Sequence, residues 1–149
     1  MLTVVLCLGV FAGSAITTGC SSQPPGISIE GQYAVLSPLF VGAGSIFMKI
    51  VNAGGADALV NAKAGLPGTL VELHDVQDGK MRKVGRIAIP PAAAVELRPM
   101  GLHIMIFKMP KEIKSGSDIV LTLTFEKSGE KQVPVKFTPP GDRSGHMQH

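Results

Sequence analysis

The stretch Asp118-Ile119-Val120-Leu121-Thr122-Leu123-Thr124-Phe125 alternates apolar and polar side chains from Ile119 onward. Successive side chains of a β-strand point to opposite faces, so the leucines and the phenylalanine share one face and the threonines occupy the other. A strand of this kind packs against a core on one side and faces solvent on the other. The stretch therefore predicts a half-buried strand in an antiparallel sheet.

Apolar and β-branched runs of similar length continue on both sides of this stretch, separated by turn signals such as Asp78-Gly79 and Pro90-Pro91. No stretch has a convincing helical period. Many short strands at this spacing are typical of an all-β sandwich or barrel, here of about eight or nine strands. The expected strands are Gln32–Ser37, Ser45–Asn52, Ala58–Ala62, Leu70–Gln77, Lys80–Ile89, Ala93–Arg98, Leu102–Lys108, Asp118–Lys127 and Lys131–Thr138.

Residues 1–19 carry no charged side chain, are mostly apolar and end in small residues before Cys20. The apolar run is short for a membrane span and has the layout of an export signal. Residues 16–22 resemble a bacterial lipoprotein box, which implies that Cys20 becomes the lipidated first residue. The box lacks a basic leader and has Thr17 where Leu is usual, and the alternative is cleavage nearby that leaves a free thiol. We expect an exported protein, held on the outer side of the membrane by a lipid anchor.

The expected organisation is an export signal at 1–19, a tether at 20–30, a β-domain at 31–138 and a flexible tail at 139–149. Of the two cysteines, Cys7 would leave with the signal, so no disulfide can form within the mature chain. The 14 Lys and Arg residues are scattered without aromatic neighbours, which gives no support to nucleic-acid binding. Stability must therefore come from a packed core.

Histidine and methionine recur together along the chain. His103 and Met105 share one face of an expected strand. The turn signal Asp78-Gly79 predicts a two-residue hairpin, in which Val76 would pair with Met81 and place its thioether diagonal to His74. Diagonal neighbours lie about 7–8 Å apart, within reach of long side chains.

If these two pairs converge at one end of the sandwich, they form a site of two imidazoles and two thioethers. Neutral nitrogen and soft sulfur favour Cu(I) over Zn(II), which usually recruits thiolate or carboxylate. The alternative is a sheet that contains satisfied histidines and core methionines by chance. Met100 and Met109 could be auxiliary ligands, but a packing role in the core or at its rim is favoured for both, and Met48 is expected in the core.

Residues 31–138 resemble the periplasmic copper chaperone family called PCu(A)C. Its pattern is a His, about ten residues, a Met, twenty-one residues and then His-x-Met; here 21 residues separate Met81 from His103-Ile104-Met105. The resemblance implies a cupredoxin-like, Greek-key β-fold that carries copper toward the dinuclear centre of cytochrome oxidase. Only six residues separate His74 from Met81, four fewer than in the family pattern. The surroundings that agree are Phe47–Asn52, Val71–His74, Val95–Leu97, Gly101–His103 and Leu121–Lys127.

The expected function is therefore to carry Cu(I) on His74, Met81, His103 and Met105 to an apo-copper protein, such as a cytochrome oxidase subunit or another copper chaperone. The tail residues His146, Met147 and His149 could bind Cu(II), or form a tail without a metal role. No catalytic motif is present, and Glu72 beside His74 is expected to be a solvated pair, so an enzyme is not expected. The alternatives are a lipid-tethered interaction module without metal and a copper storage or resistance protein.

Overall fold

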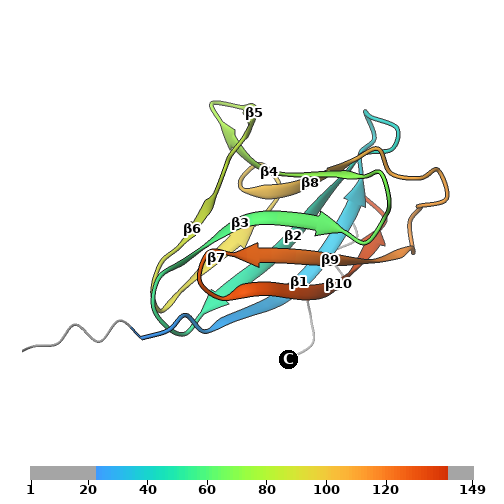
Figure 1. The fold of residues 1–149 in the computed structure, drawn as a ribbon. Helices are drawn as coiled ribbons and strands as arrows, with labels where there is room; N and C mark the ends of the chain where they lie inside the picture. Colours follow the sequence, from blue (N-terminus) through green and yellow to red (C-terminus); the bar gives the residue numbers. More distant parts are fainter. Residues whose placement is uncertain (1–22, 141–149) are drawn as a thin grey trace, which may run out of the picture.

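The computed structural model describes residues 23–140, which form ten β-strands (Figure 1). Within that range no helix is long and apolar enough to cross a membrane. The prediction of an all-β fold is confirmed, with ten strands where eight or nine were expected. The strands are β1 (Ile27–Leu36), β2 (Gly44–Asn52), β3 (Asp57–Ala64), β4 (Leu70–Gln77), β5 (Lys80–Lys83), β6 (Ile87–Ile89), β7 (Ala93–Leu97), β8 (His103–Phe107), β9 (Asp118–Phe125) and β10 (Gly129–Thr138).

The strands hydrogen-bond in the order β5-β4-β8-β2-β1-β10-β9-β3-β6, with β7 also paired to β2. Only the β1–β10 pair is parallel, and the other pairs are antiparallel. The path folds over on itself, so that β5, β4, β8, β2 and β1 form one layer and β10, β9, β3 and β6 form the other (Figure 1). The chain does not close this path into a barrel, and β5 and β6 are its two edges.

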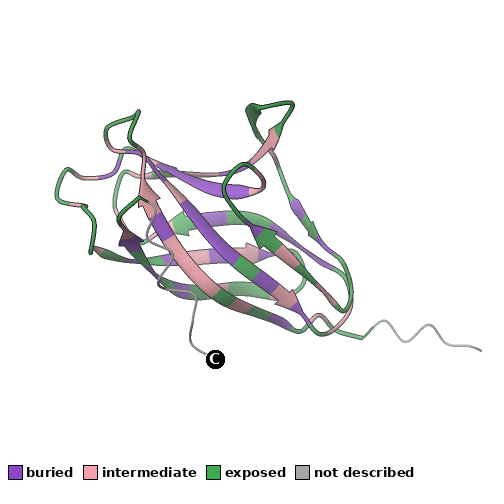
Figure 2. Cartoon of the chain, turned by 180° about the vertical axis from the view of Figure 1, so that it is seen from behind, coloured by how far each residue is buried: buried purple, intermediate pink, exposed green. Residues whose placement is uncertain are grey.

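Buried side chains from both layers form one core, and burial alternates along the strands (Figure 2). The alternation predicted for β9 is confirmed, since Ile119, Leu121, Leu123 and Phe125 are buried. The first layer contributes to this core the side chains on the face that turns toward the second layer, including Ile46, Met48, Leu73, Ile104 and Ile106. The side chains on the other face of the first layer, including His74, His103 and Met105, are not part of this core cluster.

The first strand begins at Ile27, five residues before the predicted start at Gln32, and so takes in the end of the expected 20–30 tether. The reason is long-range pairing: residues 27–30 form a ladder with residues 49–52 of β2. Gly31, with φ at +59°, lies at a bulge that shifts the register of β1 against β2. Positive φ is a conformation that glycine adopts at little cost, so the tether-like composition conceals a bulged strand.

The predicted single strand Lys80–Ile89 is wrong, because the chain divides there into β5 and β6. β5 pairs with β4 in the first layer, whereas β6 pairs with β3 in the second. The crossing occurs at residues 84–86, which include Gly85, and it allows Ile87 and Ile89 to become buried in the core. Burial of two isoleucines, at about 1.5–3 kcal/mol for each side chain, favours this break over a longer hairpin.

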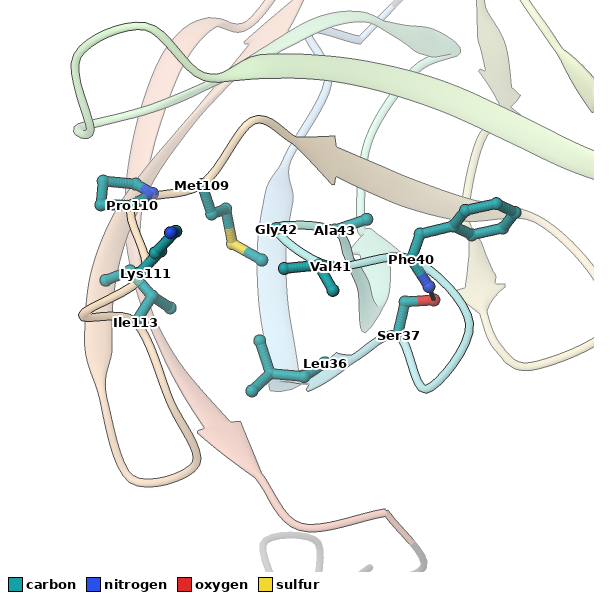
Figure 3. A pocket seen from close by; sticks show the side chains of 10 residues that line it. All are labelled: Leu36, Ser37, Phe40, Val41, Gly42, Ala43, Met109, Pro110, Lys111 and Ile113. Carbon is teal, nitrogen blue, oxygen red and sulfur yellow. Dashed lines mark hydrogen bonds between the residues drawn. The ribbon is translucent and has the colours of Figure 1, made fainter.

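A cavity of about 240 Å³ lies between the β1–β2 loop and the segment after β8 (Figure 3). Its lining is mainly apolar, with Leu36, Val41, Met109 and Ile113 around the open space. The polar side chains in the lining are Ser37 and Lys111. Neither His74 nor His103 lines it, so this cavity is separate from the histidine pair.

Candidate metal centre

The two histidines of the described chain lie side by side on the outer face of the first layer. His74 of β4 is directly opposite His103 of β8 in the antiparallel ladder, and their ring centroids are 5.8 Å apart. The neighbouring residues Leu73 and Ile104 point to the other face, into the core. The histidines themselves are 9% and 3% exposed, because Phe107 and Phe47 flank the rings at 6.2 and 6.3 Å.

The predicted hairpin register is confirmed. Val76 is opposite Met81 and His74 is opposite Lys83. Asp78 and Gly79 both have positive φ, at +52° and +71°, as a two-residue turn of type I′ requires. Met81 therefore lies on the same face as His74, one diagonal step away, and the residue is 53% exposed.

Met105 also lies on this face, with Glu72 of β4 on one side and Ser45 of β2 on the other. The Ser45 hydroxyl donates a hydrogen bond to the Met105 sulfur over 3.1 Å. Along β4, Met105 is beside Glu72 and Met81 is beside Val76, so the two thioethers flank the histidine pair from opposite sides. Glu72 and Val76 are four residues apart on β4, which corresponds to about 13 Å along the strand. The structure thus brings the two imidazoles together and leaves the two thioethers on either side of them.

Hydrogen bonds define which nitrogen of each imidazole is available. A carbonyl can only accept, so His103 donates its Nδ1–H to the oxygen of Gly101 at 2.7 Å, and Nε2 keeps the lone pair. The Nε2 of His74 lies 3.0 Å from the Glu72 carboxylate and donates to it in the same way. The Nδ1 of His74 is buried and has no hydrogen-bond partner. A buried nitrogen that carries a lone pair and lacks a partner suits a metal ligand.

The electrostatics of the pair favour neutral imidazole at His103. Burial lowers the pKa of His103, and the nearby His74 lowers it further, whereas the Gly101 carbonyl and Asp75 act in the opposite direction. The net effect is a pKa below the usual histidine value. A metal can bind only the unprotonated ring, so this environment favours the form of His103 that is able to ligate a metal.

Glu72 of β4 contacts both His74 of the same strand and Lys83 of β5. Lys83 of β5 donates to one carboxylate oxygen at 2.7 Å, and His74 donates to the other. These two hydrogen bonds, with that of Lys83 the stronger influence, hold the pKa of Glu72 below its usual range. The expectation of a solvated pair is wrong, because the Glu72 and His74 side chains are only 18% and 11% exposed.

Sequence reasoning missed the roles of Ser45, Phe47 and Lys83. Lys83 could have been found, since the predicted hairpin register already placed it opposite His74. Ser45 and Phe47 gave no such signal, because they approach the site only through the long-range pairing of β2 with β1, β7 and β8.

The remaining methionines separate into two groups. Met48 and Met109 are buried in the core, which confirms the packing role predicted for them. Met100 is 75% exposed, which excludes a core position for it; it lies in the turn before β8 with φ at +63°. Cys20, His146, Met147 and His149 lie outside the described residues. Within residues 23–140, no group of three or more His, Cys, Asp or Glu side chains is arranged to hold a metal.

Residues 27–137 match the model of a protein family described as "Putative lipoprotein LpqE-like". The chain belongs to this LpqE-like family. No curated protein matches the sequence. The matched range runs from the start of β1 to one residue before the end of β10, and it includes His74, His103 and the hairpin between β4 and β5.

The fold of this LpqE-like chain is that of solved PCuAC domains, as the sequence resemblance predicted. The copper-bound PCuAC domain of PmoF2 superposes with a TM-score of 0.64 at 24% identity, over 76% of this chain and 93% of that one. The apo PCuAC domain of PmoF1 gives 0.67 at 23% identity, over 76% and 94%. The Cu(I) form of DR1885 from Deinococcus radiodurans gives 0.65 at 18% identity, over 84% and 85%.

Proposed function

We propose that this protein binds Cu(I) on the outer face of its first layer and passes it to an apo-copper protein. The proposed ligands are His74, Met81, His103 and Met105. The observation that carries the proposal is the direct opposition of His74 and His103, each with one ring nitrogen free to coordinate. Both methionines lie on the same face.

The spacing of the rings suits one shared ion. A metal–nitrogen bond of about 2 Å on each side, together with the size of two imidazole rings, allows centroids about 5–6.5 Å apart, from tetrahedral to linear coordination. The observed separation is 5.8 Å. Two neutral imidazoles supplemented by thioether sulfur form a donor set that prefers a monovalent soft cation. The structural neighbours described as copper-bound or in a Cu(I) form support this choice of metal.

Delivery follows from the unequal burial of the ligands. His103 and Met105 are almost fully buried, whereas Met81 is half exposed on the hairpin that rises from the body of the molecule (Figure 1). An incoming cysteine or histidine of an acceptor can displace Met81 first while the inner ligands still hold the ion. Thiolates bind Cu(I) more strongly than thioethers, so transfer to a cysteine-containing acceptor is favoured.

A copper subunit of cytochrome oxidase or a second copper chaperone has the chemistry expected of the acceptor. The lipoprotein description of the family supports a location outside the cytoplasm, with Cys20 as the lipid-bearing residue. The protein acts by binding and ligand exchange, and no step of this function requires catalysis.

The test is an anaerobic Cu(I) titration against a competing chelator, carried out on the chain from residue 21 with and without residues 139–149. We expect one tightly held equivalent in both forms, and loss of that equivalent when His103→Gln and Met105→Leu are combined. Circular dichroism should show the same β-sheet signal in the variant. If only the longer form retains copper, the site lies in the tail and the proposal for the sheet is overturned.

A further inference from the structure

We propose that Glu72, anchored by Lys83, is a positioning residue that makes Nδ1 the copper-binding nitrogen of His74, while His103 binds through Nε2. This inference rests on the proposed function and adds the atoms through which it operates. It derives from the three side chains at the junction of β4 and β5 and from the single buried polar atom they leave without a partner.

The tautomer of His74 follows from the contact with Glu72. A carboxylate only accepts hydrogen bonds, so the nitrogen 3.0 Å from Glu72 Oε2 must carry the proton. In a neutral imidazole the other nitrogen then has the lone pair. That nitrogen, Nδ1, is buried without a hydrogen-bond partner, an arrangement that is costly unless a ligand uses it.

Lys83 keeps the carboxylate in place. Its Nζ is 2.7 Å from Glu72 Oε1, which leaves Oε2 directed to the histidine. The residues come from the paired strands β4 and β5, with Lys83 directly opposite His74. Carboxylate–histidine–metal arrangements fix ring orientation and raise the basicity of the ligating nitrogen. The hairpin thus supplies both the exposed Met81 and the lysine that orders the inner histidine.

The two histidines therefore carry their ring proton on different nitrogens. His103 donates from Nδ1 to the backbone oxygen of Gly101, whereas His74 donates from Nε2 to a side chain. The backbone contact is unaffected by side-chain replacement, but the Glu72 contact can be altered. A mutation at Glu72 should therefore disturb one copper ligand and leave the other as it is.

Glu72→Gln provides a sharp test, because Lys83 should keep the amide oxygen and turn the amide NH₂ toward His74. An NH₂ group donates, so His74 should switch to the Nδ1–H tautomer, which blocks the proposed copper nitrogen. We expect Cu(I) affinity to fall about 10–100-fold, the usual effect of losing a partner that orients a metal ligand. Glu72→Ala removes the contact that favours the Nε2–H tautomer of His74 but does not favour the other tautomer. Its loss of Cu(I) affinity should therefore be smaller. Glu126→Gln is the matched control, since Glu126 pairs with Arg86 in the second layer.

Long-range ¹⁵N–¹H NMR of the full mature chain identifies the protonated nitrogen of each histidine without copper, and Ag(I), a mimic of Cu(I), identifies the nitrogen that binds. We expect His74 to be protonated at Nε2 and to respond to Ag(I) at Nδ1, and Glu72→Gln to exchange the protonated position. A response at Nε2, or a tautomer that does not depend on Glu72, overturns the positioning role. Absence of copper or silver binding by the unmutated chain overturns the proposed function instead, and the metal-free spectra still report the tautomer.

Discussion

Ser45 donates a hydrogen bond from its hydroxyl to the Met105 sulfur, with 3.1 Å between Oγ and Sδ. The two residues are directly opposite each other in the β2–β8 ladder. β2 lies on the side of β8 away from β4, so the bond holds the sulfur on the side opposite His74. If Met105 ligates copper as proposed, its sulfur must turn away from Ser45 to share an ion with both histidines.

Ser45→Ala should tighten Cu(I) binding, because the hydrogen bond stabilises the metal-free orientation of Met105. Such a hydrogen bond contributes a net stabilisation of about 0.5–1 kcal/mol, so its loss corresponds to a two- to fivefold gain in Cu(I) affinity. The measurement is a chelator competition titration, with Ser37→Ala as the control, since the Ser37 hydroxyl accepts from the backbone of the β1–β2 loop and does not contact β8. Weaker binding by Ser45→Ala would mean that the hydroxyl prepares the sulfur for the metal.

The methionines should respond selectively to metal. With ¹³C-labelled methyl groups, addition of Ag(I) is expected to shift the resonances of Met81 and Met105, because a metal–sulfur bond changes the electronic environment of the adjacent methyl. Met100 is the internal control, since it is 75% exposed and competes for any non-specific silver binding. A shift at Met100 without one at Met81 would indicate non-specific binding alone and would contradict Met81 as a ligand.

Much of the fold could be predicted from the sequence because side-chain alternation is a local property. The half-buried strand at β9 and the hairpin at Asp78-Gly79 both follow from residues within a few positions of each other. The first half of β1 and the break between β5 and β6 do not follow from neighbouring residues. Their pairing partners are in β2 and β3, far away in the chain, and the gain from burying Ile87 and Ile89 cannot be read from the hairpin itself.

For the site, the sequence placed His74 and Met81 on one face and His103 and Met105 on another strand. What it could not give was the pairing of β4 with β8, which sets the two histidines directly opposite each other. Strand partners are selected by packing of the whole sheet. Glu72 was noticed as a neighbour of His74, and the predicted hairpin register already placed Lys83 opposite that histidine, but the low exposure of Glu72 depends on the packing of the whole sheet.

Asp57 should make the fold sensitive to acid. It is buried, which raises its carboxyl pKa, but hydrogen bonds from Ser128, Lys127 and Ala58 outweigh this effect and the net pKa is lowered. A lowered folded-state pKa stabilises the fold above the unfolded value of about 3.9, and this stabilisation is lost as the pH falls through the folded value. Asp57→Asn should cost about 1–3 kcal/mol at pH 7 and less near pH 3, as measured by urea unfolding. An equal cost at both pH values would contradict this assignment, and the exposed Asp118→Asn is the control.

Gly79→Ala should weaken copper binding through the hairpin alone. Gly79 has φ at +71° and a Cβ there would meet no atom within 4 Å, so the substitution adds backbone strain of about 1 kcal/mol without a clash. Gly68→Ala is a matched control, with φ at +78° and equally open surroundings in the β3–β4 loop. Thermal unfolding should show similar small losses in both variants. Cu(I) affinity should fall several-fold only in Gly79→Ala, because strain at this turn displaces Met81 and Lys83, and an equal fall in both would remove the hairpin from the site.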